Sequence, residues 1–182
     1  MKIIFTCFLI FQDALRTFNR SEIFLVDSSI RFHSSNITSL QNFALGSNGV
    51  CAFILRHSIF SATPPDMFRF LPMVKSAKKE GCRMGGLVLL YRTKFVIDNI
   101  LHWWVACALS RTCIYSERNR FCRFTKDSWN DFAHCSRYDQ SALSIILVNA
   151  FSNSTQILGP NLKDKKLIEI ARFGSSNKVK KC

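Results

Sequence analysis

The chain has 182 residues, of which 48% are hydrophobic, and its formal net charge is +13. This length fits one compact domain, and 17 Phe and 3 Trp residues are enough to build its core, which excludes a mostly disordered protein. The charge invites a nucleic-acid function, but Lys and Arg are spread as singles and short groups, without a recognition helix or zinc-finger spacing, so we expect no nucleic-acid partner.

The first segment, 1–11, is apolar after an initial lysine. It has the charge and the hydrophobic run of a short signal peptide, but polar residues follow at once without a small-residue cleavage site, so a buried strand is an equal alternative. A membrane-spanning helix needs about 20 apolar residues, and we expect none here. We expect a domain over 12–158 and a polar, basic C-terminal tail over 159–182.

An apolar run over 22–26 predicts a buried strand that ends at Asp27. Ligands of open α/β sheets bind at the carboxyl ends of the strands, which makes Asp27 a candidate binding residue. The alternative, which these residues alone favour, is a turn in which Asp27 accepts hydrogen bonds from the next backbone amides.

Two further apolar runs, 50–55 and 87–91, predict strands, and the second is typical of a central strand because it is unbroken. Gly85 and Gly86 precede it directly. Residues without a side chain let another backbone or a ligand approach closely.

Three helices are expected, over 63–72 with Thr63 as its cap, after Thr93 as far as Leu109, and from Asp139 to Ala150. The second helix has a polar stripe, formed by Lys94, Asp98 and His102. Its apolar face consists of Val96, Ile100, Trp103, Trp104 and Cys107. The paired tryptophans can stack a sugar, but core packing is the better interpretation at this spacing. Asp139 is well placed as the N-cap of the third helix, which is the alternative to a catalytic role.

Eight Cys residues are many for a cytosolic chain of this length, and four of them fall within one short window. These four are Cys107, Cys113, Cys122 and Cys135. The close Cys pairs of zinc sites are absent, so disulfides are favoured. Glycosylation sequons at Asn19, Asn36 and Asn153 fit the same oxidising compartment. We expect a secreted or Golgi-lumenal protein of the secretory pathway, or a cytoplasmic one if the N-terminus is not a signal.

Four segments occur in the same order in a known family. They are 26–32 (VDSSIRF), 85–93 (GGLVLLYRT), 102–109 (HWWVACAL) and 135–143 (CSRYDQSAL). Over about residues 12–150 the chain resembles the C-terminal part of a nematode-expanded family of poorly characterised glycosyltransferase-like proteins, of divergent GT-A type.

The resemblance implies an α/β fold: a partial GT-A-like nucleotide-diphospho-sugar transferase fold, with a mixed sheet flanked by helices and a cysteine-rich loop. Asp27 matches the strand-end motif that holds a divalent cation, Mn²⁺ or Mg²⁺, and the diphosphate of the donor. The motif has one carboxylate here, Asp27-Ser28-Ser29, where the family pattern has two. The donor-binding residues implied by the resemblance are Asp27, Ser29, Arg31, Gly85 and Gly86.

The same resemblance implies that Asp139 and Gln140 are catalytic, with Asp139 acting as a base on the acceptor or orienting the donor. The expected function is transfer of a sugar from a nucleotide sugar to a glycan or other hydroxyl acceptor. Only 26 residues precede Asp27, so we expect a truncated domain that is inactive alone. A small disulfide-stabilised secreted binding protein is the alternative. We predict that Asp27 and Asp139 lie at the same sheet edge.

The family also has clustered cysteines just before its Asp-Gln helix. With the local density of cysteines and the sequons, this predicts a disulfide between Cys122 and Cys135, and Cys107 with Cys113 as the second pair. Closing the loop of about 14 residues between Cys122 and Cys135 would stabilise the fold by roughly 3 kcal/mol in the chain-entropy model.

Overall fold

The computed structural model describes residues 13, 22–73, 76–114, 121–151 and 168–170. Its strands are β1 (Glu22–Val26), β2 (Ile30–Phe32), β3 (Val50–Ser58), β4 (Gly81–Tyr91) and β5 (Ile168–Ile170). Its helices are α2 (Thr38–Gly46), α3 (Ile59–Ala62), α4 (Met67–Phe70), the 3₁₀ helix η1 (Ser76–Lys79), α5 (Lys94–Val96), the π-helix η2 (Ile97–Leu101), α6 (His102–Leu109), α7 (Arg111–Ile114) and α8 (Tyr138–Ala150).

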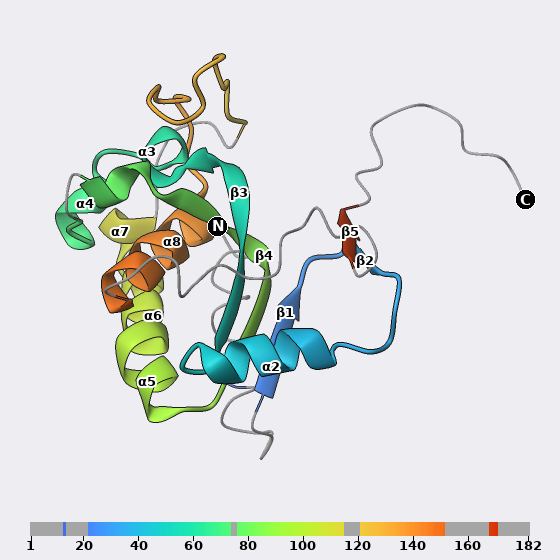
Figure 1. Cartoon of the computed structure of the whole chain (residues 1–182). Coiled ribbons are helices and arrows are strands. Elements are labelled where there is room, and N and C mark those ends of the chain that lie inside the picture. Colours follow the sequence, from blue (N-terminus) through green and yellow to red (C-terminus); the bar gives the residue numbers. More distant parts are fainter. Residues whose placement is uncertain (1–12, 14–21, 74–75, 115–120, 152–167, 171–182) are drawn as a thin grey trace, which may run out of the picture.

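The main sheet has the order β1-β4-β3, with β4 in the centre (Figure 1). The three strands predicted from apolar runs are confirmed, and β3 and β4 extend further than expected. The predicted mixed sheet is wrong, because every strand pair in the described part is antiparallel. An unbroken apolar run often marks a parallel strand. Here β4 is apolar because helices cover both of its faces.

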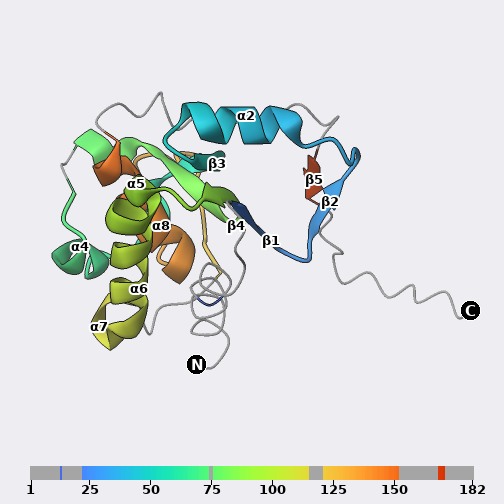
Figure 2. The ribbon, with the colours of Figure 1, turned by 90° about the horizontal axis from the view of Figure 1, so that it is seen from below.

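Two helical layers enclose this sheet, one on each face (Figure 2). Figure 2 shows α2 on one side of the sheet and α5, α6 and α8 on the other. Side chains of β4 alternate between the two layers: Val88 and Leu90 pack with the α6 and α8 residues, and Leu87 and Leu89 pack with Leu40 of α2. This alternation is the period of two that a strand imposes on its side chains. It buries both faces of β4.

The helix after Thr93 begins as predicted, since Thr93 Oγ1 accepts a hydrogen bond from the backbone N–H of Val96 at 3.1 Å. Its predicted apolar face is wrong at Trp103, which is 53% exposed, whereas Trp104 is 3% exposed. The π-helical turn η2 explains the difference. It adds a residue before α6 and turns the later side chains by roughly 100° relative to a continuous α-helix.

Other expected features differ in detail. Thr63 is the C-cap of α3, and α4 has Asp66 at its N-cap, so the predicted cap of that segment is wrong. β5 lies within the segment predicted as a tail and pairs with β2, where Ile30 faces Ile170. The expectations for segment 1–11 and for the last residues of the tail fall outside the described residues. Among the described residues, no helix is long and apolar enough to cross a membrane.

Candidate functional site

Asp27 follows the last residue of β1 and lies beside the glycines of β4. Its backbone N–H donates to the carbonyl of Gly86 at 2.7 Å, which extends the β1–β4 ladder by one residue. Its Oδ1 accepts a hydrogen bond from the backbone N–H of Ser29 at 2.8 Å. The turn that the sequence offered as an alternative is therefore present. Asp27 is exposed, so the turn does not remove its carboxylate from solvent.

Gly85 and Gly86 lie inside β4, where the expected strand had only begun after them. A methyl group on Gly86 would lie 2.7 Å from Cβ of Asp27, and one on Gly85 would lie 3.0 Å from Cβ of Gln140. Real Cβ atoms essentially never approach to 2.7 Å and rarely to 3.0 Å, and dense interiors accommodate added atoms poorly. The two glycines therefore allow the end of β1 and the start of α8 to approach β4 together.

Asp139 is the second residue of α8 and is half-buried. The helix has Arg137 at its N-cap and no capping side chain, so the predicted N-cap role of Asp139 is wrong. Burial raises the pKa of Asp139, and the charge of Asp27 raises it further, against backbone hydrogen bonds and the charge of Arg137. Asp27 and Asp139 thus lie close enough to interact, at the edge where we predicted them. Their chemical roles stay predictions.

Gln140 is held by a small polar network beneath the glycines. Its side-chain Nε2 donates to Sγ of Cys82 at 3.1 Å, and Sγ lies 3.3 Å from Oγ of Ser144. Ser144 Oγ in turn accepts from the backbone N–H of Arg83 at 2.8 Å and donates to the carbonyl of Gln140 at 2.7 Å. Burial raises the pKa of the Cys82 thiol, which keeps it neutral and unreactive.

Sequence reasoning missed this network, because Ser144 lies on the predicted helix but Cys82 precedes the predicted strand. Arg83, which joins it through its backbone, has a fully buried side chain. Its guanidinium group donates to the carbonyl of Gly81, and Nε and one terminal nitrogen have no hydrogen-bond partner among the described residues. Burial lowers the pKa of Arg83. No periodicity in the sequence marks a buried cation near the start of this strand.

Both predicted disulfides are confirmed. The Cα atoms of Cys122 and Cys135 are 4.9 Å apart, and those of Cys107 and Cys113 are 5.2 Å apart. These separations are inside the range that a disulfide can bridge. Such bridges are compatible with a secreted or lumenal protein.

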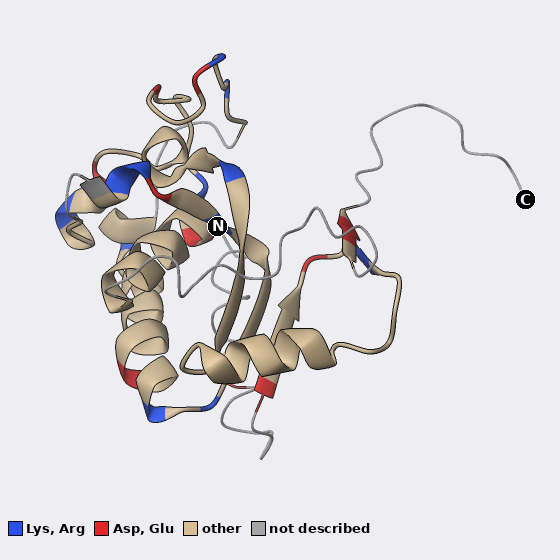
Figure 3. Cartoon of the chain, viewed as in Figure 1, with Lys and Arg blue, Asp and Glu red and all other residues tan. Residues whose placement is uncertain are grey.

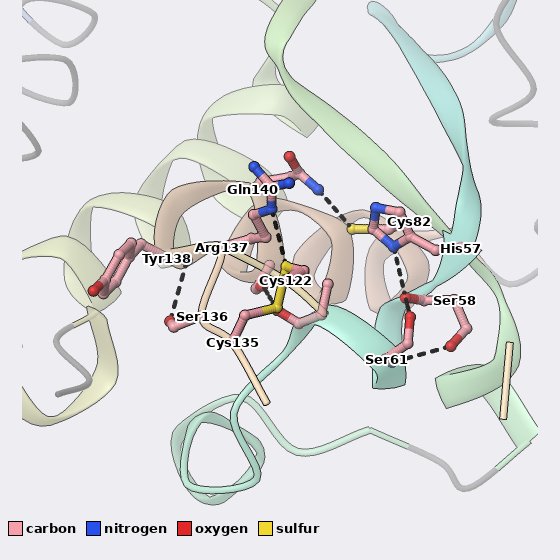
Figure 4. The surroundings of a disulfide bond; sticks show 12 residues. His57, Ser58, Ser61, Cys82, Cys122, Cys135, Ser136, Arg137, Tyr138 and Gln140 are labelled. Carbon is pink, nitrogen blue, oxygen red and sulfur yellow. Dashed lines mark hydrogen bonds between the residues drawn. A yellow bond between two sulfur atoms is a disulfide. The ribbon is translucent and has the colours of Figure 1, made fainter. Parts of the chain in front are cut away.

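The Cys122–Cys135 bridge anchors the loop that leads to α8 (Figure 4). Ala133 donates its backbone N–H to the carbonyl of Ser61 at 2.8 Å, which ties the loop to α3. Arg137 donates from Nε to Sγ of Cys122 at 3.3 Å and from its backbone N–H to the carbonyl of Ala62 at 3.3 Å. The bridge therefore lies directly beside the first residues of the candidate site. Sequence reasoning did not single out Arg137.

The remaining predicted residues lie in turns. Arg31 donates from one terminal nitrogen to the carbonyls of Ser28 at 2.5 Å and Ile30 at 2.9 Å, so its guanidinium group binds its own turn. Asn36 is exposed, and its Oδ1 accepts from the backbone N–H of Thr38 at 3.0 Å. The sequons at Asn19 and Asn153 fall outside the described residues.

The charges of the described part are of both signs, and Lys and Arg are interspersed with Asp and Glu over its elements (Figure 3). Within this part of the chain, no three His, Cys, Asp or Glu side chains group closely enough to hold a metal ion. At the strand-end motif, Asp27 brings one carboxylate and uses one of its oxygens in the turn. Mn²⁺ and Mg²⁺ prefer several oxygen ligands, of which this motif supplies one carboxylate, so a divalent cation at Asp27 stays a prediction.

No protein-family model, curated protein or solved structure matches the chain. Any function must therefore be inferred from the residues of the site.

Proposed function

We propose that the chain is a glycosyltransferase-like protein that binds a nucleotide-diphosphate sugar beside Gly85 and Gly86. The observation that carries the proposal is that Asp27 and Gln140 approach these glycines and that Asp139, the neighbour of Gln140, interacts with Asp27, so three distant segments supply one small site. Exposed acids often lie in turns. Two interacting acids beside a pair of glycines at the end of a strand form the more specific arrangement.

The segments that carry the family resemblance support the same site. Segment 26–32 contributes Asp27, segment 85–93 contributes the two glycines, and segment 135–143 contributes Asp139 and Gln140. Segment 102–109 lies behind them as α6, where Trp104 packs in the core with α8. Motifs that are far apart in the sequence are thus adjacent in the fold, as expected for parts of one site.

Asp139 is the residue best suited to proton transfer. A carboxylate whose pKa is raised by burial and by a neighbouring acid is a better base near neutral pH than an ordinary one. In the proposed reaction, the acceptor hydroxyl loses its proton to Asp139 as its oxygen bonds to the anomeric carbon. The bond from that carbon to the diphosphate breaks, and the nucleoside diphosphate leaves with the electron pair. No step of this reaction is assigned to a metal ion.

Calorimetric titration with UDP and with GDP, each with and without Mn²⁺, tests the proposal. We expect the wild-type chain to bind at least one of them and Asp139→Asn to change that binding. Asp98→Asn is the matched control, because Asp98 lies on α5–η2 in an exposed pair with Lys94. If the wild-type chain binds neither nucleotide under either condition, the proposal is wrong.

The two disulfides favour one alternative, a secreted binding protein of the secretory pathway without catalysis. Small secreted domains use such bridges where the core alone is insufficient. This alternative predicts no nucleotide binding with or without Mn²⁺. It also predicts that Asp27→Asn has no effect on any ligand, because Asp27 would then be a turn residue only.

A further inference from the structure

Arg137 is a cation at the candidate site whose charge acts on Asp139. It is half-buried at the N-cap of α8, between the disulfide loop and the helix. Its Nε donates to Sγ of Cys122, and its backbone is bonded to α3. Among the described residues, no carboxylate or carbonyl group accepts a hydrogen bond from its two terminal nitrogens. The arginine is therefore positioned through one nitrogen and keeps its outer two for another partner.

The charge of Arg137 reaches three groups around the site. It lowers the pKa of Asp139, of Cys82 and of His57. These groups lie on α8, β4 and β3, so the charge of Arg137 acts on side chains of all three elements. Figure 4 shows Arg137 bonded to the disulfide and Gln140 bonded to Cys82 at the start of α8.

We propose that Arg137 is the anion-binding residue of this site and that it takes the diphosphate of the ligand in place of a metal ion. The inference rests on the proposed function for the identity of the ligand. A diphosphate beside Asp27 and Asp139 needs a positive charge, and no three metal-ligating side chains group together among the described residues. The planar guanidinium group donates two parallel hydrogen bonds to phosphate oxygens, and an arginine held in place loses little freedom when it does so.

The Cys122–Cys135 bridge has a specific part in this site. It holds the sulfur that orients Nε, so the guanidinium plane is fixed before a ligand arrives. Preorganised donors act on a developing or bound anion without a cost of reorganisation. Arg137 is thus a binding residue, and the bridge is its support.

Calorimetric titration with inorganic pyrophosphate and with UDP, both without divalent cations, tests the proposal. Arg137→Gln should bind pyrophosphate about 10- to 100-fold more weakly than the wild type, the range expected for hydrogen bonds to a charged group. The affinity of Arg137→Lys for pyrophosphate should lie between those of the wild type and Arg137→Gln, because lysine keeps the charge but lacks the two parallel N–H donors of arginine. Arg92→Gln removes the same charge at the exposed end of β4 and should bind as the wild type does.

A ligand-free measurement accompanies the titrations. Carboxyl NMR signals report the pKa of Asp139, which should rise in Arg137→Gln and stay unchanged in Arg92→Gln. This readout, together with a native near-ultraviolet circular dichroism spectrum, separates a lost charge from a lost fold.

The outcomes distinguish the two proposals. Pyrophosphate binding that depends on Arg137 supports the anion site, and if UDP is not bound as well, the nucleotide-sugar function is wrong. Equal binding of pyrophosphate by the wild type and Arg137→Gln overturns the role of Arg137 and leaves the nucleotide function standing. No binding of either probe by the folded wild-type chain overturns both.

Discussion

The sheet with α8 and the loop over 121–137 are stabilised by different means. On α8, Leu143, Ile145 and Leu147 are fully buried against the sheet and the neighbouring helices. The loop has a much smaller apolar cluster, in which Ala133 and Cys135 pack on Ala62 of α3. A disulfide and backbone hydrogen bonds hold the rest of it. The candidate site lies where the two regions meet, so its acids depend on the core and its arginine depends on the bridge.

The largest effect should come from the core. Leu143→Ala removes a fully buried side chain from α8 and should lower the free energy of unfolding by about 2–5 kcal/mol, because it leaves a cavity beside β4. Leu109→Ala, at a position that is 63% exposed, should change it by less than about 0.5 kcal/mol. Urea unfolding measures both. Equal losses would mean that α8 is not the main support of the sheet.

Removal of the Cys122–Cys135 bridge should lower the free energy of unfolding by less than the largest loss expected for Leu143→Ala, and it should loosen a different region. The double variant Cys122→Ser/Cys135→Ser should lose about 3 kcal/mol in the chain-entropy model, and the shorter Cys107–Cys113 loop about 2 kcal/mol. Hydrogen exchange should show faster opening of residues 121–137 first, with the amides of β4 still protected. Uniform loss of protection would contradict the division into two regions.

A third test pushes β1 away from β4 at the candidate site. Gly86→Ala places a methyl group 2.7 Å from Cβ of Asp27, and pushing β1 away should cost about 1–3 kcal/mol. Gly46→Ala is the matched control, since its added methyl meets nothing within 4 Å. There the substitution should stabilise α2 by up to about 1 kcal/mol. Thermal unfolding of the two variants should therefore shift in opposite directions.

The smallest expected effect is the pH dependence caused by Asp139. Its pKa is raised in the folded state, first by burial and then by Asp27, so the folded chain holds this proton more tightly than the unfolded chain does. That contribution to stability is fully present below the unfolded pKa and is lost as the pH rises through the folded pKa. The stability of the wild type relative to Asp139→Asn should therefore fall as the pH rises through that range. Denaturant midpoints at a series of pH values measure this difference, and the opposite slope would mean that Asp139 is stabilised as a carboxylate.

Much of the fold was predictable because strands and helices carry their own patterns. Apolar runs located β1, β3 and β4, and Thr93 located the start of a helix. Strand direction was not predictable, since a run that is buried on both faces looks the same in parallel and antiparallel sheets. The exposure of Trp103 was also not predictable from the sequence, because it follows from the π-helical turn, which no residue pattern in 97–101 marks.

The site was predictable in part. Asp27, the glycines and Asp139 follow from strand ends, small residues and the family motifs, and the disulfides follow from the clustering of cysteines. Arg137 was missed because its importance is positional. Its Nε donates to a disulfide sulfur, and its charge acts on groups of three different elements, which no local pattern records. Arg31, by contrast, was close to Asp27 in sequence, but its guanidinium group is bound to its own turn.

Cys51 and Cys82 are buried free thiols on neighbouring strands, and they belong to opposite faces of the sheet. Burial raises the pKa of Cys51 to about 12 and also raises that of Cys82, so neither reacts with an alkylating reagent while its face is closed. The time course of alkylation at each thiol, followed by mass spectrometry of its peptide, therefore reports the opening rate of one layer. Cys51 reports the layer formed by α2, and Cys82 reports the layer formed by α8. The native chain thus already contains a separate kinetic reporter for each side of its sheet, without any added label.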